Sequence, residues 1–145
     1  MSGTGTNQAA AHYQPGMEVG RAPSRKPFIY VAGPISKDPF GCVRQATEVW
    51  PTLRRAGAVP FLPQLSIIHE IVAPLPYEEW MAYDFDVLEM ADGLVRLPGE
   101  SPGAEREIDH ANTIGVPVHR YASLEGADAD AQLFEWVWRL AHGTL

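Results

Sequence analysis

Short apolar segments alternate with amphipathic stretches along most of this chain, and this alternation constrains its fold more than any other feature. The apolar segments have the length and composition of β-strands, and they lie at residues 28–32, 58–63, 93–97 and 116–121. Apolar residues at helical spacing fill the intervals, at residues 40–56, 64–72, 77–91, 102–114 and 130–141. Strands that alternate with helices form a parallel sheet covered on both faces. We therefore predict an α/β, Rossmann-like (flavodoxin-like) open sandwich, with a central, mainly parallel sheet of about four to five strands flanked by helices.

Prolines and glycines refine this prediction locally. Pro51 should kink or split the first predicted helix, because proline donates no backbone hydrogen bond. Pro60 indicates that the second strand lies at an edge of the sheet. Ser101 can cap a helix that begins at Pro102. Gly115 should end that helix.

The first 26 residues differ in composition from the rest of the chain. They are rich in small and polar residues and have few large apolar side chains. Such a segment cannot bury enough apolar surface to offset the entropy lost on ordering. We expect residues 1–26 to form a flexible tail and residues 27–145 to form a single domain.

Composition and charge exclude several classes of protein. The chain has 145 residues and a net charge of -7, and an acidic chain has little general affinity for nucleic-acid polymers. Its single cysteine, Cys42, excludes a disulfide scaffold. No apolar run is long enough to span a membrane, and the N-terminus carries no apolar signal core. We expect a cytoplasmic protein that binds neither membranes nor nucleic-acid polymers.

Two carboxylates lie where the helical pattern predicts apolar faces. Asp84 falls in the middle of the apolar face of the 77–91 segment. Glu107 falls at the edge of the packed face of the 102–114 segment. A carboxylate in such a position is costly unless it is paired, hydrogen-bonded or placed in a cleft. Each is therefore either a structural acid or a functional group, and two of them on helices that flank one strand favour a functional site.

The loops after the first and third strands supply polar groups at the same end of the predicted sheet. In an open α/β sheet, the ligand crevice lies beyond the carboxyl ends of the strands. Tyr30, on the first strand, either packs in the core or carries its hydroxyl to this crevice. The loop residues that we expect to bind substrate there are Gly33, Pro34, Ile35, Ser36, Gly99, Ser101 and Gly103.

These motifs together resemble the nucleoside 2-deoxyribosyltransferase superfamily, which includes the 2′-deoxynucleoside 5′-phosphate N-hydrolases. The resemblance lies in the segment Tyr30-Val31-Ala32-Gly33-Pro34, in Asp84, and in the segment Ser101-Pro102-Gly103-Ala104-Glu105-Arg106-Glu107. It covers residues 28–121. It implies an N-glycosidase or deoxyribosyltransferase that acts on small nucleosides or nucleotides and forms a homodimer or higher homo-oligomer. We expect no metal or other cofactor, because His69, His110 and His119 lack the spacing of metal ligands.

The resemblance also implies roles for individual residues. Glu107 matches the nucleophile that attacks the anomeric carbon. Asp84 matches an acid that contacts the sugar hydroxyls or orients the nucleophile, and Tyr30 matches a tyrosine whose hydroxyl orients it. Asp92 matches an acid near the base, where it can serve proton transfer to the leaving nitrogen.

The sequence leaves open whether the substrate must carry a 5′-phosphate. Ser101 and Gly103 match the loop that holds a 5′-phosphate in the nucleotide hydrolases. Ser36, however, stands where those hydrolases usually carry a phosphate-binding arginine.

Two alternative functions also stay open. The segment from Leu97 to Glu107 shares spaced glycines and a glutamate with the phosphoribohydrolases that act on ribonucleotides. The same pocket would also suit a non-catalytic module that senses a nucleotide. The aromatic residues Phe134, Trp136 and Trp138 are a candidate oligomer surface or part of the core.

Overall fold

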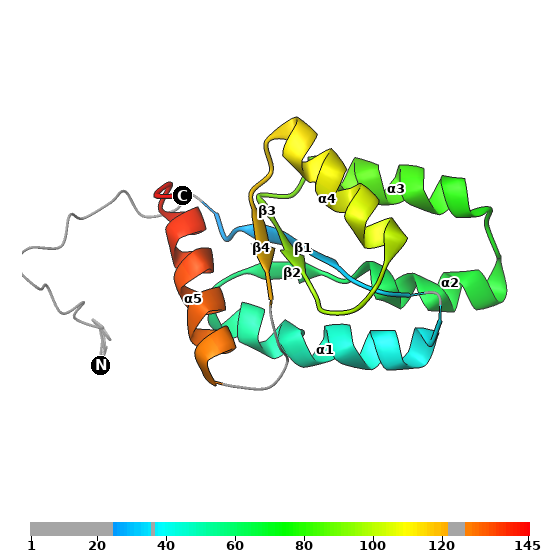
Figure 1. The fold of residues 1–145 in the computed structure, drawn as a ribbon, viewed down its shortest axis with the longest axis horizontal. Coiled ribbons are helices and arrows are strands. Elements are labelled where there is room, and N and C mark those ends of the chain that lie inside the picture. Colours follow the sequence, from blue (N-terminus) through cyan, green and yellow to red (C-terminus); the bar gives the residue numbers. More distant parts are fainter. Residues whose placement is uncertain (1–24, 36, 122–126) are drawn as a thin grey trace, which may run out of the picture.

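A single parallel sheet organises the molecule (Figure 1). The computed structural model describes residues 25–35, 37–121 and 127–145. The strands are β1 (Phe28–Ala32), β2 (Val59–Phe61), β3 (Gly93–Arg96) and β4 (Val118–Arg120). They form a 4-stranded sheet in the order β2-β1-β3-β4, and every neighbouring pair is parallel. The predicted Rossmann-like architecture is therefore confirmed, and β2, which contains Pro60, lies at an edge as expected.

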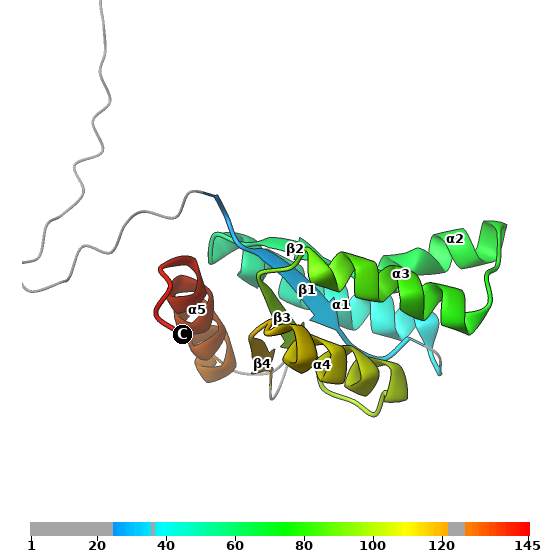
Figure 2. The same ribbon diagram turned by 90° about the horizontal axis from the view of Figure 1, so that it is seen from above.

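Helices cover both faces of this sheet. They are α1 (Pro39–Arg55), the 3-10 helix η1 (Pro63–Ser66), α2 (Ile67–Val72), α3 (Tyr77–Glu89), α4 (Pro102–Ile114) and α5 (Ala127–Ala141). Helices α1 and α5 pack on one face, and α3 and α4 lie side by side on the other. Figure 2 shows the pair α3 and α4 from above. This arrangement places the two helices that carry the predicted acids next to each other.

Alternating residues of the central strands separate the core into two layers. Ile29 and Val31 of β1 point toward α1 and α5, whereas Tyr30 and Ala32 point toward α3 and α4. This follows from the two-residue period of a strand. The apolar partners of Tyr30 in the second layer are buried side chains of β3, α3 and α4: Leu94, Val87, Leu88, Ala104, Ile108 and Ala111.

The local signals in the sequence have mixed outcomes. Ser101 caps α4, since its hydroxyl accepts a 3.1 Å hydrogen bond from the backbone N–H of Ala104. Gly115 ends that helix in the left-handed conformation, with φ 79°. Of the two outcomes expected at Pro51, a split of the helix is wrong, because α1 continues through Pro51, and a kink stays a prediction. Pro51 and Thr47 both lie on the exposed side of α1, where water can satisfy the Thr47 carbonyl that loses its helical partner.

Most of the predicted tail lies outside the described residues, which begin at Arg25. Within the described ranges, no helix combines the length and the apolar character that a membrane crossing requires.

Candidate active site

A buried hydrogen bond joins the middle of the sheet to α4. The Tyr30 hydroxyl donates to Oε1 of Glu107 over 2.7 Å. Tyr30 is fully buried, and Glu107 is only 4% exposed. Both alternatives that the sequence left open for Tyr30 therefore apply. Its ring packs in the core, and its hydroxyl reaches Glu107.

Glu107 and Asp84 both line a cavity of about 790 Å³. Asp84 comes from α3 and is 7% exposed, so both acids lie on buried helix faces, as the helical pattern predicted. A cavity of this size is large enough for a drug-sized ligand. The arrangement brings two carboxylates from adjacent helices to one wall.

Burial shifts the protonation of both acids. It raises the pKa of Glu107 to about 8, and the neighbouring charge of Asp84 acts in the same direction. The Tyr30 hydrogen bond and the positive charge of Arg96 oppose this shift. Burial raises the pKa of Asp84 to about 6. As the pH rises, Asp84 therefore ionises before Glu107, and Glu107 keeps its proton to a higher pH than an exposed glutamate does.

Tyr30 stays protonated over the whole of this range. Its burial, followed by the negative charges of Glu107 and Asp84, raises its pKa well above the usual value of a tyrosine. The hydroxyl can therefore only donate its proton to a carboxylate, and it favours the ionised form of Glu107.

The two predicted loops reach the cavity only in part. Gly33 and Ile35 from the first loop line it, as do Ser101 and Gly103 from the second. The remaining residues predicted in these loops have other placements: Pro34 packs near Gly99, Gly99 lines a second cavity, and Ser36 lies outside the described residues. Gly99 has φ +109°, and a Cβ there would lie 2.9 Å from Cγ of Pro34. Glycine is therefore needed where the two loops meet.

The structure does not bring Asp92 to the cavity. Asp92 immediately precedes β3 and so lies at the amino end of the sheet, whereas the cavity lies at the carboxyl ends of the strands. Its carboxylate accepts two hydrogen bonds from Arg25, at 2.6 and 2.8 Å, and one from the backbone N–H of Phe28 at 2.7 Å. Asp92 fastens the start of β1 to the start of β3.

Sequence reasoning missed one wall of the cavity. Glu70 of α2 accepts a 2.7 Å hydrogen bond from the Trp80 indole N–H and a 3.1 Å bond from the backbone N–H of Leu75, and all three residues line the cavity. The aromatic pair Tyr77 and Trp80, separated by nearly one helical turn, was the available signal. These residues provide an apolar and aromatic surface together with a carboxylate.

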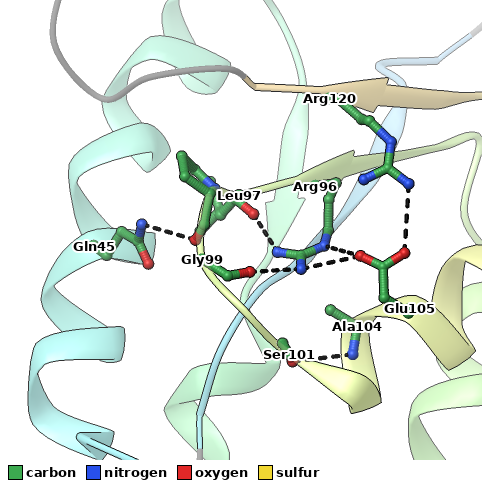
Figure 3. A network of polar contacts seen from close by, with 9 residues as sticks. Gln45, Arg96, Leu97, Gly99, Ser101, Ala104, Glu105 and Arg120 are labelled. Atoms are coloured by element: carbon green, nitrogen blue, oxygen red, sulfur yellow. Dashed lines mark hydrogen bonds and ion pairs between the residues drawn. The ribbon is translucent and has the colours of Figure 1, made fainter.

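Arg96 makes hydrogen bonds to the loop that joins β3 to α4 (Figure 3). It is 6% exposed, and its guanidinium donates to the carbonyls of Leu97 and Gly99 and to the carboxylate of Glu105. The second cavity, of about 490 Å³, adjoins this network, and Ser101 lines both cavities. The two cavities therefore adjoin at the start of α4.

A comparison with solved structures agrees with this fold. No family model and no curated protein matches the chain. A solved structure titled "2-desoxiribosyltransferase from Leishmania mexicana" matches with a TM-score of 0.52 at 18% sequence identity. The two chains share a fold. The alignment covers 66% of this chain and 63% of the other, so it spans less than two thirds of that enzyme's length. The resemblance stated from the motifs is thereby supported at the level of the fold.

The described residues contain no group of three or more His, Cys, Asp or Glu side chains able to hold a metal ion.

Proposed function

We propose that this protein cleaves the N-glycosidic bond of a nucleoside or deoxynucleoside, or of the corresponding 5′-monophosphate. The observation that carries the proposal is the Tyr30–Glu107 hydrogen bond at the wall of a cavity that also receives Asp84. A buried carboxylate held by a neutral donor is suited to attack a carbon that develops positive charge. The deoxyribosyltransferase fold gives the proposal independent support.

In the proposed reaction, the ionised Glu107 attacks the anomeric carbon. A bond forms between a carboxylate oxygen and C1′, while the bond from C1′ to the base nitrogen breaks and its electron pair leaves with the base. The departing base takes up a proton from solvent. A water molecule, or the N–H nitrogen of a second base, then attacks C1′ and loses its proton to solvent, while the bond from C1′ to the Glu107 oxygen breaks and the carboxylate is released.

The other residues have supporting roles in this proposal. Asp84 contacts the sugar hydroxyls, and Tyr30 orients the nucleophile. The aromatic wall of Tyr77 and Trp80 provides a surface on which a base can stack. Ser101 and Gly103 lie at the N-terminus of α4, where an anionic substituent is favoured. Asp92 is given no role in this reaction, because it does not line the cavity.

Chromatography tests the proposal directly. Pooled deoxynucleosides, ribonucleosides and their monophosphates are incubated with the protein, with and without a second free base. We expect release of a free base, or formation of a new nucleoside when a second base is present. Glu107→Ala should abolish both products. Tight nucleotide binding without any product would support the alternative of a sensing module, and preference for ribose monophosphates would support a phosphoribohydrolase.

Intact-protein mass spectrometry tests the covalent step. After rapid acid quenching, a fraction of the protein should gain the mass of one glycosyl group. Glu107→Gln should show no such gain under the same conditions. A glycosyl adduct that persists in this variant would contradict the role of Glu107.

We also propose that the protein forms a homo-oligomer, as the resemblance implies. Apolar side chains of η1 and α2 are exposed beside the cavity, and they include Leu65, Ile68, Ile71 and Val72 at 52, 63, 65 and 79% exposure. Of the aromatic residues predicted as an oligomer surface, Trp136 packs against the core, while Phe134 and Trp138 are 36 and 49% exposed. Light scattering after size-exclusion chromatography measures the mass. Ile71→Lys and Trp138→Lys indicate which surface is involved.

A further inference from the structure

Arg96 occupies an unusual position for a charged residue. It is the last residue of β3, a central strand, and pairs in register with Ala32 of β1. Its side chain lies on the same face of the sheet as Leu94 and therefore under α4, which carries Glu107. A buried guanidinium is costly unless its donors are satisfied. The partners of Arg96 therefore indicate what it does.

Those partners belong to the segment that leads into α4. One terminal nitrogen donates to the Gly99 carbonyl over 2.7 Å and lies 3.1 Å from Oε1 of Glu105. The other terminal nitrogen donates to the Leu97 carbonyl, and Nε donates to Glu105 over 3.2 Å. Figure 3 shows these contacts, which run from the Arg96 side chain to Leu97 after β3, to the loop and to the first turn of α4. The planar guanidinium suits such a multiple contact, which an ammonium group cannot reproduce.

The segment fixed in this way contributes two residues to the large cavity. Ser101 and Gly103 follow Gly99 and line the cavity with Glu107. A Cβ on Gly99 would lie 2.9 Å from Cγ of Pro34, so the loop after β1 approaches this segment closely. Arg96 therefore holds a segment that lines the cavity and adjoins the loop after β1.

Arg96 also contributes to the charge balance around Glu107. The charged or titratable groups that act on Glu107 come from three elements: Tyr30 on β1, Asp84 on α3 and Arg96 on β3. Glu70 on α2 and Tyr77 on α3 line the same cavity. Asp84 disfavours a charged Glu107, whereas Arg96 favours it. Of the groups that act on Glu107, Arg96 is the cation.

On the basis of the proposed function, we propose that Arg96 is a positioning residue of this site. Its guanidinium holds the loop that presents Ser101 and Gly103 to substrate, and its charge favours the ionised form of the Glu107 nucleophile. Arg96 acts through the loop and through Glu107, without touching the reacting atoms.

Two substitutions separate the two effects. Arg96→Gln removes the charge and keeps an amide donor for a loop carbonyl. Arg96→Lys keeps the charge but cannot reach Leu97, Gly99 and Glu105 together. For Arg96→Gln, we expect the acid limb of kcat/KM to move to higher pH by about 0.5 units or more. For Arg96→Lys, we expect that limb to stay in place while KM rises about tenfold.

A measurement without substrate keeps this proposal distinct from the proposed function. Carbon-13 NMR follows the titration of the Glu107 carboxyl group, assigned by its absence in Glu107→Gln. Its midpoint should rise in Arg96→Gln and stay unchanged in Arg96→Lys. If the wild type releases no base from any nucleoside, the proposed function fails, and the NMR titration still tests the electrostatic role of Arg96.

Arg120→Gln is the matched control. Arg120 also contacts Glu105, at 3.4 Å, but it is exposed. The Arg120→Gln variant should have the same Glu107 titration midpoint and the same KM as the wild type. Titration midpoints and KM values equal to wild type in folded Arg96→Gln and Arg96→Lys would overturn the proposal. If Arg96→Gln does not fold, the KM of Arg96→Lys decides the positioning role, and an unchanged value overturns it.

Discussion

Tyr30 Oη lies 2.7 Å from Glu107 Oε1, and this short contact joins the central strand of the sheet to the helix that carries the candidate nucleophile. Both side chains are inaccessible or nearly inaccessible to bulk water. A hydrogen bond between a charged acceptor and a neutral donor is strong in such a place. The contact fixes the direction of the carboxylate and favours its ionisation.

Removal of this hydroxyl should impair the reaction. In Tyr30→Phe, Glu107 loses the donor that lowers its pKa, so the acid limb of kcat/KM should move to higher pH. We expect kcat to fall about 10- to 100-fold. Steady-state kinetics between about pH 5 and pH 9 measures both changes, because this range includes the pKa of Glu107 at about 8.

Tyr121→Phe is a suitable control for that substitution. Tyr121 is also buried, and its hydroxyl bonds to Asp130 at 2.5 Å, in the core layer of α1 and α5. It should leave the pH profile unchanged. Profiles of Tyr30→Phe and wild type that superimpose would contradict the role of the Tyr30 hydroxyl.

The pH dependence of the wild type should reflect the raised pKa of Glu107. In the proposed reaction only the ionised carboxylate attacks, so kcat/KM should rise with pH and level off above about 8. In Asp84→Asn, the charge that raises the Glu107 pKa is absent, so the acid limb should move to lower pH. A limb that stays in place or moves to higher pH in this variant would show that Asp84 does not act on Glu107 electrostatically.

Glu107→Gln should be more stable than the wild type at alkaline pH. The folded-state pKa of Glu107 is about 8, against an ordinary value of 4.5. Such a raised pKa gives stability that is fully present below 4.5 and is lost as the pH rises toward 8. A permanently neutral glutamine avoids this loss.

Thermal unfolding measures the effect. We expect Tm of Glu107→Gln to exceed that of the wild type by about 5 °C or more at pH 8, and the difference to vanish near pH 4, roughly the ordinary range of a glutamate. Glu48→Gln on the exposed side of α1 should show no such pH-dependent difference. Equal Tm values for Glu107→Gln and wild type at both pH values would contradict the burial of a protonated Glu107.

Trp80 should contribute to substrate binding. Trp80→Phe keeps an aromatic ring in the cavity but loses the 2.7 Å hydrogen bond that holds Glu70. We expect KM to rise about three- to tenfold with little change in kcat, because a binding surface is altered and the reacting groups are not. Trp50→Phe, at an exposed position on α1, provides the comparison. A loss confined to kcat would contradict a binding role for this wall.

Gly93 should be required for stability. A Cβ at this position would lie 2.6 Å from Cη2 of Trp136 and 2.9 Å from Cδ2 of Leu140. We expect Gly93→Ala to lower the free energy of unfolding by about 1–3 kcal/mol, measured by urea denaturation. The double variant Gly93→Ala, Trp136→Phe should recover part of this loss, since the smaller ring leaves room. No recovery would mean that the Trp136 contact is not the cause.

Periodicity made much of the fold predictable. The limits of β1 and of α4 follow from the apolar runs and from Ser101, Pro102 and Gly115, because these signals are local. The split expected at Pro51 did not occur, because the cost of a lost hydrogen bond depends on exposure, which a linear pattern does not contain.

The candidate site was predictable where a polar residue stands out from an apolar pattern. Asp84 and Glu107 are such residues, and both prove to be buried at one cavity. Asp92 and Glu70 do not stand out in this way. The placement of Asp92 depends on which end of a strand faces the cavity, and that of Glu70 depends on which short helix lies beside it. Arg96 ends a short apolar strand, and its charge alone could not indicate that its partners would be loop carbonyls.

The pairing of Arg25 with Asp92 has a practical meaning for protein production. The two hydrogen bonds of the guanidinium, with a third from Phe28 N–H, occupy the Asp92 carboxylate at the entry to the sheet. A shortened version for crystallisation or NMR should therefore begin no later than Arg25. A version that starts at Phe28 would place a charged amino terminus beside Asp92 and lose the two-point contact that fastens the first strand.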